Sequence, residues 1–151
     1  MTTVLKGAEG IHAAVGKSLG FSGYVEVTQE RIDQFAEATG DHQWIHVDVQ
    51  RAKTGPYGKT IAHGLLTLPM IAVLAKDMFR IEGFRMGIHY GYEKVRFPSP
   101  VPVGSRIRLG AKVLCCEEVA EGMQTVMEQT IEVEGTTKPA CVAQMIFRHM
   151  L

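Results

Sequence analysis

The sequence lacks several features that mark specialised classes of protein. It has only 3 cysteines in 151 residues, an odd number in which Cys115 and Cys116 are adjacent and Cys141 stands alone. This pattern indicates neither a disulfide framework nor the C-x-x-C spacing of a zinc or redox site. We therefore expect buried thiols in a reducing cytoplasm, because free cysteine usually behaves as a small core residue.

An excess of charge of one sign is also missing, since 16 Lys+Arg residues balance 16 Asp+Glu residues. The chain then has no electrostatic basis for displacing counterions, and we expect no nucleic-acid partner. The most apolar window, Leu65–Leu74, is far shorter than the ~20 residues of a membrane span. The N-terminal residues lack the charged start and apolar stretch of a secretory signal. These absences predict a cytoplasmic protein with no membrane partner.

Motifs for phosphate binding and for serine nucleophiles are absent as well. There is no G-x-G-x-x-G run, no P-loop and no G-x-S-x-G elbow, so we expect no cofactor. What is present is ordinary globular composition, with 46% hydrophobic and 21% charged residues. At this length the composition predicts one domain over residues 1–151, in which residues 1–20 form an N-terminal extension.

Two helices are predicted on either side of residues 24–64, the first in the N-terminal part of the chain and the second directly after this segment. A weak helix is predicted around Lys6–Val15, followed by a loop through Gly20 and Gly23. The segment Leu65–Met78 is apolar almost all round, so we expect a helix that is buried on most sides. Pro69 should kink this helix or mark its start.

A third helix has clear signals at both ends. Thr28 offers a hydroxyl N-cap, and Glu30 places a negative charge at the positive end of the helix. Gly40 is a natural stop, so the helix ends immediately before Asp41. A single helical turn is expected after Asp48.

The C-terminal half predicts strands, because apolar and polar residues alternate along it. The alternating runs cover residues 88–97, 107–113, 123–133 and 141–147, with a phase slip at 93–94 that indicates a bulge. One buried helix followed by about four antiparallel strands predicts an α+β fold in which a curved sheet wraps the helix.

The strongest candidates for chemistry are Asp41 and His46, at the two ends of a short irregular turn. A carboxylate and an imidazole held in this way can share one water and act as acid and base, and histidine titrates near neutrality. The alternative is structural, since an aspartate after a helix often forms a turn and a histidine beside Val47 often packs in a core.

A metal site is a second alternative. His42 and His46 are four residues apart, and Asp41, Asp48 and His63 offer further ligands. However, Gly40 ends the helix before this pair, and the glutamate of an H-E-x-x-H motif is missing. We therefore expect no metal.

Gly64 is the third candidate, in the run Ile61-Ala62-His63-Gly64 that opens the apolar helix. The first N–H groups of a helix have no partner within it, and a glycine there allows a ligand oxygen to come close. Such an N–H can act as an oxyanion donor. Close packing of the helix is the alternative explanation for this glycine.

At these residues the sequence resembles the MaoC-like, or hydratase 2, family of (R)-specific enoyl-thioester hydratases. The family motif is Gly-Asp, a variable residue, usually Asn-Pro, an aliphatic residue and His. Here it stands as Gly40-Asp41-His42-Gln43-Trp44-Ile45-His46, followed by Asp48 and Ala52, so that Gln43-Trp44 replaces Asn-Pro. The segments Ala62-His63-Gly64-Leu65 and Val95–Gly104 also resemble the family, and the resemblance spans roughly Phe21–Phe147.

The resemblance implies a hot-dog fold, a central helix wrapped by an antiparallel sheet, and a homodimer with an acyl-thioester tunnel near the interface. The implied reaction is reversible syn addition of water to trans-2-enoyl-CoA, or an acyl-carrier thioester, giving the (3R)-hydroxyacyl product without metal. In it Asp41 and His46 hold the water and the Gly64 N–H polarises the thioester carbonyl. We favour His46 as the base and Asp41 as the group that returns a proton, although the reverse order stays open.

Two other functions remain open. A hot-dog acyl-CoA thioesterase uses the same fold but needs no Asp41–His46 pair over a double bond. A non-catalytic acyl-CoA-binding module tolerates the loss of both residues, so their presence counts against it.

Overall fold

The computed structural model describes all residues 1–151, with short helices between residues 29 and 77 and long strands after residue 86. In chain order the elements are β1 (Thr3–Lys6), α1 (Gly7–Ala14), β2 (Ser18–Phe21), β3 (Val25–Glu26), α2 (Gln29–Thr39), α3 (Trp44–Val47), α4 (Val49–Ala52), α5 (Gly64–Thr67), the 3-10 turn η1 (Leu68–Met70), α6 (Ile71–Leu74), the 3-10 turn η2 (Ala75–Asp77), β4 (Phe79–Glu82), β5 (Met86–Arg96), β6 (Arg106–Val119), β7 (Gly122–Val133) and β8 (Cys141–Met150).

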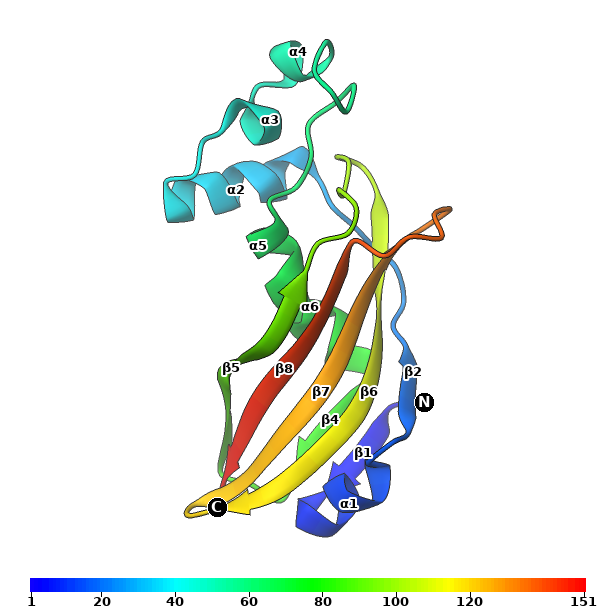
Figure 1. Cartoon of the computed structure of the whole chain (residues 1–151), viewed down its shortest axis with the longest axis vertical. Coiled ribbons are helices and arrows are strands. Elements are labelled where there is room, and N and C mark those ends of the chain that lie inside the picture. Colours follow the sequence, from blue (N-terminus) through cyan, green and yellow to red (C-terminus); the bar gives the residue numbers. More distant parts are fainter.

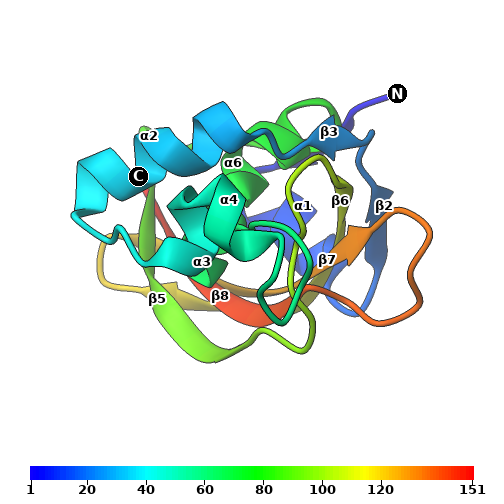
Figure 2. The same ribbon diagram turned by 90° about the horizontal axis from the view of Figure 1, so that it is seen from above.

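Five strands form a curved antiparallel sheet in the order β2-β6-β7-β8-β5, and the short β3 pairs with the start of β6. The sheet curves around the α5–α6 segment (Figure 1). The helices α2, α3 and α4 gather over one end of the sheet, as the view from above shows (Figure 2). β1 pairs in parallel with β4 as a separate two-stranded sheet. The predicted α+β hot-dog arrangement, a central helix wrapped by an antiparallel sheet, is confirmed.

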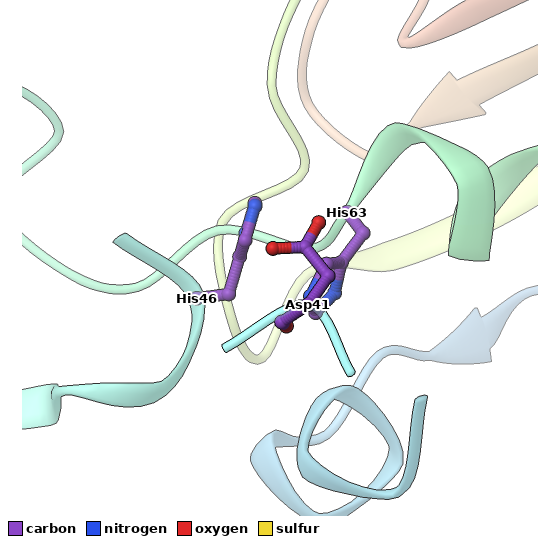
Figure 3. Close-up of side chains that lie close together, drawn as sticks. All are labelled: Asp41, His46 and His63. Carbon is purple, nitrogen blue, oxygen red and sulfur yellow. The ribbon is translucent and has the colours of Figure 1, made fainter. Parts of the chain in front are cut away.

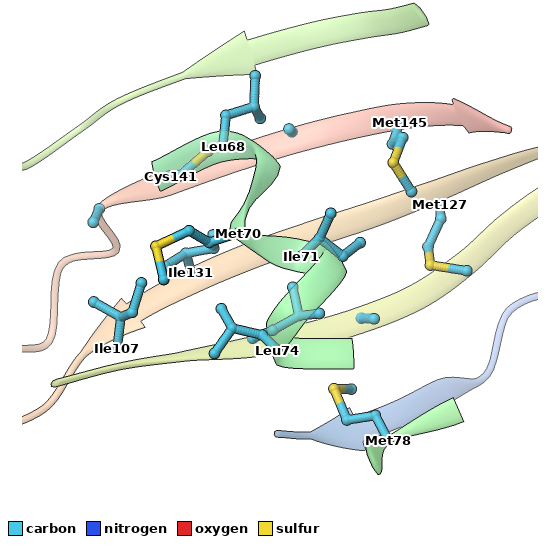
Figure 4. Packing of buried hydrophobic residues seen from close by; sticks show 14 of the residues in the cluster. Leu68, Met70, Ile71, Leu74, Met78, Ile107, Met127, Ile131, Cys141 and Met145 are labelled. Atoms are coloured by element: carbon cyan, nitrogen blue, oxygen red, sulfur yellow. The ribbon is translucent and has the colours of Figure 1, made fainter. Parts of the chain in front are cut away.

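The core lies between this sheet and the central helix. Every second residue of Met123–Val133 in β7 is buried, and so is every second residue of Ile107–Val113 in β6. This alternation follows from the two-residue period of a strand, which sends successive side chains to opposite faces. The inward-facing side chains meet Ile71 and Leu74 of α6 (Figure 4).

The central helix is divided at Pro69, as predicted. Pro69 lies in the 3-10 turn η1, because proline has no N–H to donate to an α-helical ladder. The helix is buried on most sides, as predicted, except along one stripe where Leu65 is 64% exposed and Val73 is 42% exposed. An apolar stripe of the helix therefore faces outward. No helix in the structure has the length and apolar character that crossing a bilayer requires.

The strand predictions are confirmed in position but are too short for β6 and β8. The predicted bulge is present, since the register between β5 and β8 shifts between Tyr92 and Lys94. The loop predicted through Gly20 and Gly23 is wrong in its first part, because Ser18–Phe21 form the edge strand β2 against β6. Three of the four residues of β2 are exposed, so this strand has no alternation of buried and exposed positions that the sequence could reveal.

The three thiols differ in burial. Cys141 is buried, and this burial raises its pKa to about 11. Burial also raises the pKa of Cys116, which is half-buried, but Cys115 is exposed. The expectation of buried thiols is therefore wrong for Cys115. Neighbouring residues of an extended strand point to opposite faces, and β6 continues through this pair.

Candidate active site

The end of α2 places Asp41. Thr28 caps the start of this helix by accepting a hydrogen bond from the Arg31 N–H, and Gly40 ends it in the left-handed region at φ 77°. Both predicted end signals are confirmed. The Asp41 carboxylate accepts a hydrogen bond from the Gln43 N–H at 3.3 Å and stays exposed. The carboxylate is thus held toward the turn that leads into α3.

His46 lies in α3 and is 7% exposed. Its Nδ1 lies 2.6 Å from the carbonyl oxygen of Ile61. Because a carbonyl oxygen only accepts, Nδ1 carries the proton and Nε2 keeps its lone pair. Burial lowers the pKa of His46, the hydrogen bond to Ile61 opposes this, and the charges of His63 and Asp41 lower and raise it respectively. His46 is therefore a neutral base at neutral pH.

Gln29, in the first turn of α2, fixes the backbone around His46. Its Nε2 donates to the His46 carbonyl oxygen at 2.8 Å, and its Oε1 accepts from the Thr60 hydroxyl at 2.5 Å. The Ile61 N–H also donates to the Ile45 carbonyl oxygen at 3.0 Å. These bonds lock α3 against the strand-like segment that leads to Gly64, so the imidazole has little freedom to move.

His63 joins the site, although the sequence placed it only among possible metal ligands. Its Nε2–H donates to the backbone carbonyl oxygen of Asp41 at 3.0 Å. Its ring stacks on the ring of His46 at 3.8 Å and 25°, and Phe35 packs against it at 4.7 Å. Figure 3 shows the Asp41, His46 and His63 side chains lying together. The sequence signals for this role are that His63 directly precedes Gly64 and lies in the segment Ala62-His63-Gly64-Leu65 that resembles the family.

Gly64 is the first residue of α5, so its N–H has no partner within the helix. Gly64 and His46 both line a cavity of about 350 Å³, together with Phe97. A Cβ at position 64 would lie 3.1 Å from the Phe97 ring. The three predicted site residues therefore meet at one end of the central helix, with Asp41 beside this cavity and the other two on its wall.

The structure assembles a different set of possible metal ligands from the one that the spacing suggested. One ligand atom each from Asp41, His46 and His63 lie within 4.8 Å of one another. His42 instead lies 3.5 Å from Glu37 as a surface pair. Asp48 caps α4 by accepting from the Arg51 N–H at 2.9 Å. Two imidazoles and one carboxylate are a donor set that transition metals accept.

Known proteins resemble this chain over most of its length. Residues 11–137 match the MaoC like domain. The 3-hydroxyacyl-thioester dehydratase Z of Mycobacterium tuberculosis is 50% identical over 139 residues, covering 91% of this chain and 92% of that protein. Nodulation protein N of Rhizobium leguminosarum bv. viciae is 43% identical over 140 residues, covering 90% of this chain and 86% of that protein.

A solved structure shares the fold. The unliganded R-hydratase PhaJ1 of Pseudomonas aeruginosa superposes with a TM-score of 0.71 at 21% identity, covering 90% of this chain and 81% of that one. At this identity the likeness concerns the fold alone. The domain match covers well over half of the chain and a relative shares half of its residues, so the chain belongs to the MaoC-like dehydratase family.

Proposed function

We propose that this protein reversibly hydrates trans-2-enoyl thioesters, such as enoyl-CoA, to (3R)-hydroxyacyl thioesters by syn addition of water. The observation that carries the proposal is the convergence of Asp41 and His46 beside the amino end of the central helix. Hydration of an enoyl thioester needs a base for the water, a proton for the α carbon and a donor to the carbonyl oxygen. The likeness to dehydratase Z supports the same class of substrate.

His46 is the base in this proposal. Its Nε2 carries a lone pair because the proton on Nδ1 is held by Ile61. As the water oxygen bonds to the β carbon, Nε2 takes one proton from that water. The Ile61 carbonyl stabilises the imidazolium that forms, because it already accepts from the other ring nitrogen.

Asp41 is the group that returns the proton. The proton passes from His46 to the carboxylate and from there to the α carbon, so one water is added and the pair regains its starting protonation. Because both groups act from the same side of the double bond, hydroxyl and proton arrive on one face. This geometry gives syn addition. The reverse reaction uses the same path and eliminates water from the (3R)-hydroxyacyl thioester.

The Gly64 N–H is the oxyanion donor. Attack at the β carbon moves charge onto the thioester oxygen as an enolate forms, and an N–H already fixed in a helix start stabilises that charge without reorganising. The absence of a side chain at Gly64 lets the thioester approach the backbone, whereas a Cβ there would lie 3.1 Å from the Phe97 ring and narrow this space.

A homodimer completes the proposal. β5 is the last strand of the sheet and has an unpaired edge, with exposed apolar residues Met86, Ile88 and Tyr90. The outward apolar stripe of the central helix, with Leu65 and Val73, adds further uncovered apolar surface. Antiparallel pairing of β5 with β5 of a second copy covers this surface and satisfies the edge N–H and C=O groups. The two sheets then become continuous.

This pairing also creates an acyl tunnel near the interface. Two antiparallel copies of β5 place the start of one strand, near Met86, opposite the end of the other, near Phe97. Phe97 lines the cavity that holds His46 and Gly64. The acyl chain of a thioester bound at one Gly64 is therefore directed toward the partner subunit.

One assay tests the proposal against its alternatives. The protein is mixed with crotonyl-CoA, and the absorbance of the conjugated enoyl thioester is followed together with free thiol. Loss of absorbance without thiol release is expected for hydration, and chiral analysis of the product should give the (3R) isomer. Thiol release would identify a thioesterase. Binding of crotonyl-CoA with neither change would identify an acyl-CoA-binding module and refute the proposal.

A further inference from the structure

A second cavity, of about 330 Å³, lies against the later part of the central helix, away from Gly64. Its walls come from the helix and from the inward faces of β4, β5, β7 and β8. The apolar side chains include Ile71, Phe79, Phe84, Met127, Met145 and Phe147. Figure 4 shows Met127 and Met145 on the helix side of the sheet, near Ile71.

Two polar groups interrupt this apolar wall. Thr125 is 0% exposed and His149 is 5% exposed, and both line the cavity. Thr125 Oγ1 and His149 Nε2 are buried and have no hydrogen-bond partner in the protein. Buried polar side chains are nearly always paired, so two orphaned groups in one small cavity indicate a ligand that pairs with them.

The charges around the cavity define the chemistry of that ligand. Burial lowers the pKa of His149 and of His89, which also lines the cavity, so both rings are neutral near pH 7. Arg80 is the only lining residue with a fixed charge, and its Nε donates to Glu82 while the side chain stays 60% exposed. The cavity thus offers uncharged donors and acceptors among apolar walls. A hydroxyl or keto oxygen suits it better than a carboxylate.

We propose that this cavity receives the far end of the acyl chain and selects chains that carry a hydroxyl or keto oxygen for Thr125 and His149. The inference rests on the proposed function and on the proposed dimer. Met86, Gly87 and His89 of β5 line the cavity, and antiparallel pairing places them opposite the end of the partner's β5. In this dimer the cavity with His46 and Gly64 of one subunit faces the second cavity of the other subunit. The volume of the second cavity suits on the order of ten non-hydrogen atoms.

The test compares trans-2-decenoyl-CoA with the analogue that carries a hydroxyl one carbon from the end of the chain. The wild type should use the hydroxylated substrate with a kcat/KM ~3- to 10-fold higher, the range expected for one net hydrogen bond. Thr125→Val keeps the shape but removes the hydroxyl, so it should abolish the preference for the hydroxylated chain. Thr130→Val, on the outer side of the same strand, is the matched control and should preserve the preference.

His149→Phe supplies an independent second variant, because it keeps an aromatic ring and removes the orphaned nitrogen. Loss of the preference in both cavity variants supports the proposal. An absent preference in the wild type, or a preference that survives in both variants, overturns it.

Failure of the proposed function is recognised separately. Crotonyl-CoA has a four-carbon acyl group, which in this proposal is too short to enter the second cavity, so its hydration tests the catalytic residues alone. If crotonyl-CoA is not hydrated, calorimetric binding of decanoyl-CoA and its hydroxylated analogue to wild type and Thr125→Val still decides the cavity proposal. Equal affinities for the two ligands would overturn it without reference to turnover.

Discussion

His63 offers the sharpest test of how the site is held together. It touches both members of the proposed catalytic pair, through a hydrogen bond to the Asp41 carbonyl oxygen and a stack on the His46 ring. It does not line the cavity that holds Gly64. We therefore expect a positioning residue, whose loss disturbs the chemical step more than substrate binding.

Two variants separate the two contacts. His63→Phe keeps a ring beside His46 but removes the N–H that holds Asp41, whereas His63→Gln keeps a donor and removes the ring. The lost hydrogen bond at 3.0 Å costs about 1 kcal/mol of folding stability, because the Asp41 carbonyl is only part-buried and water can replace the donor. A displacement of Asp41 by about 1 Å is enough to lower the rate ~10²-fold. His63→Phe should therefore lose ~10- to 100-fold in kcat with KM unchanged, and His63→Gln should recover part of that loss.

The pH profile of kcat/KM distinguishes a positioning role of His63 from a purely structural one, because a loss of packing alone does not change the pKa of His46. Protonation of His46 removes the base, so activity should fall on the acid side, below the ordinary histidine value of 6.5, because burial lowers the pKa of His46. The charge of His63 lowers that pKa further, so both His63 variants should move the acid limb to higher pH. Phe35→Leu is the control, since it removes the other aromatic contact of the His63 ring and leaves both histidines in place. An unchanged kcat and acid limb in His63→Phe would refute the positioning role.

Asp41→Asn and His46→Gln should each lower hydration by at least ~10²-fold with circular dichroism unchanged, and the double variant should be far from additive because both groups act on one water; near-wild-type activity of either would remove it from the mechanism. Gly64→Ala places a Cβ 3.1 Å from the Phe97 ring and should lower kcat/KM ~10- to 100-fold without lowering Tm, since alanine favours helix; a fall in Tm with normal turnover would make Gly64 a packing residue. Activity should survive prolonged EDTA treatment, whereas loss on chelation with recovery on zinc addition would instead support ligation by Asp41, His46 and His63. Burial lowers the folded-state pKa of His46 and His149, so their contribution to the free energy of unfolding should be fully present above pH 6.5 and be lost below it, because unfolding then takes up protons. Denaturant titrations at about pH 7.5 and about pH 5.5 measure this difference, and equal midpoints would contradict it.

Local sequence signals predicted the parts of the fold that local chemistry determines. Thr28 and Gly40 gave both ends of α2 because a hydroxyl cap and a left-handed glycine act within one helical turn. The outward stripe with Leu65 was not predictable, since whether an apolar residue is covered depends on which elements surround it. β2 was missed for a related reason, because an edge strand rich in small residues has no alternation to detect.

The proposed catalytic pair, Asp41 and His46, could be predicted from the sequence, but the residues that hold the pair in place could not. Asp41 and His46 are five residues apart, so the turn that joins them and the family motif both lie in one short segment. The contact between His63 and Asp41 spans 22 residues, and Gln29 reaches His46 across 17. Such contacts are set by how α2 packs over the amino end of the central helix. Neither spacing nor composition carries that information.

Burial keeps two histidines neutral near pH 7, His46 at one end of the central helix and His149 at the other. At one end, burial keeps His46 unprotonated, and the Ile61 carbonyl decides which nitrogen is free to act as a base. At the other end, burial keeps His149 uncharged among apolar walls. If this ring were charged, an acyl chain that entered the cavity would strip water from the charge, and binding would become less favourable. Removing burial at either position should therefore raise the pKa of that histidine, but only at His46 should this lower the rate with crotonyl-CoA. NMR titration of the two imidazole signals, in variants that open one cavity or the other to water, measures the pKa of each ring. If the rate of crotonyl-CoA hydration fell when the pKa of His149 rose, and not when the pKa of His46 rose, the assignment of His46 as the base would be refuted.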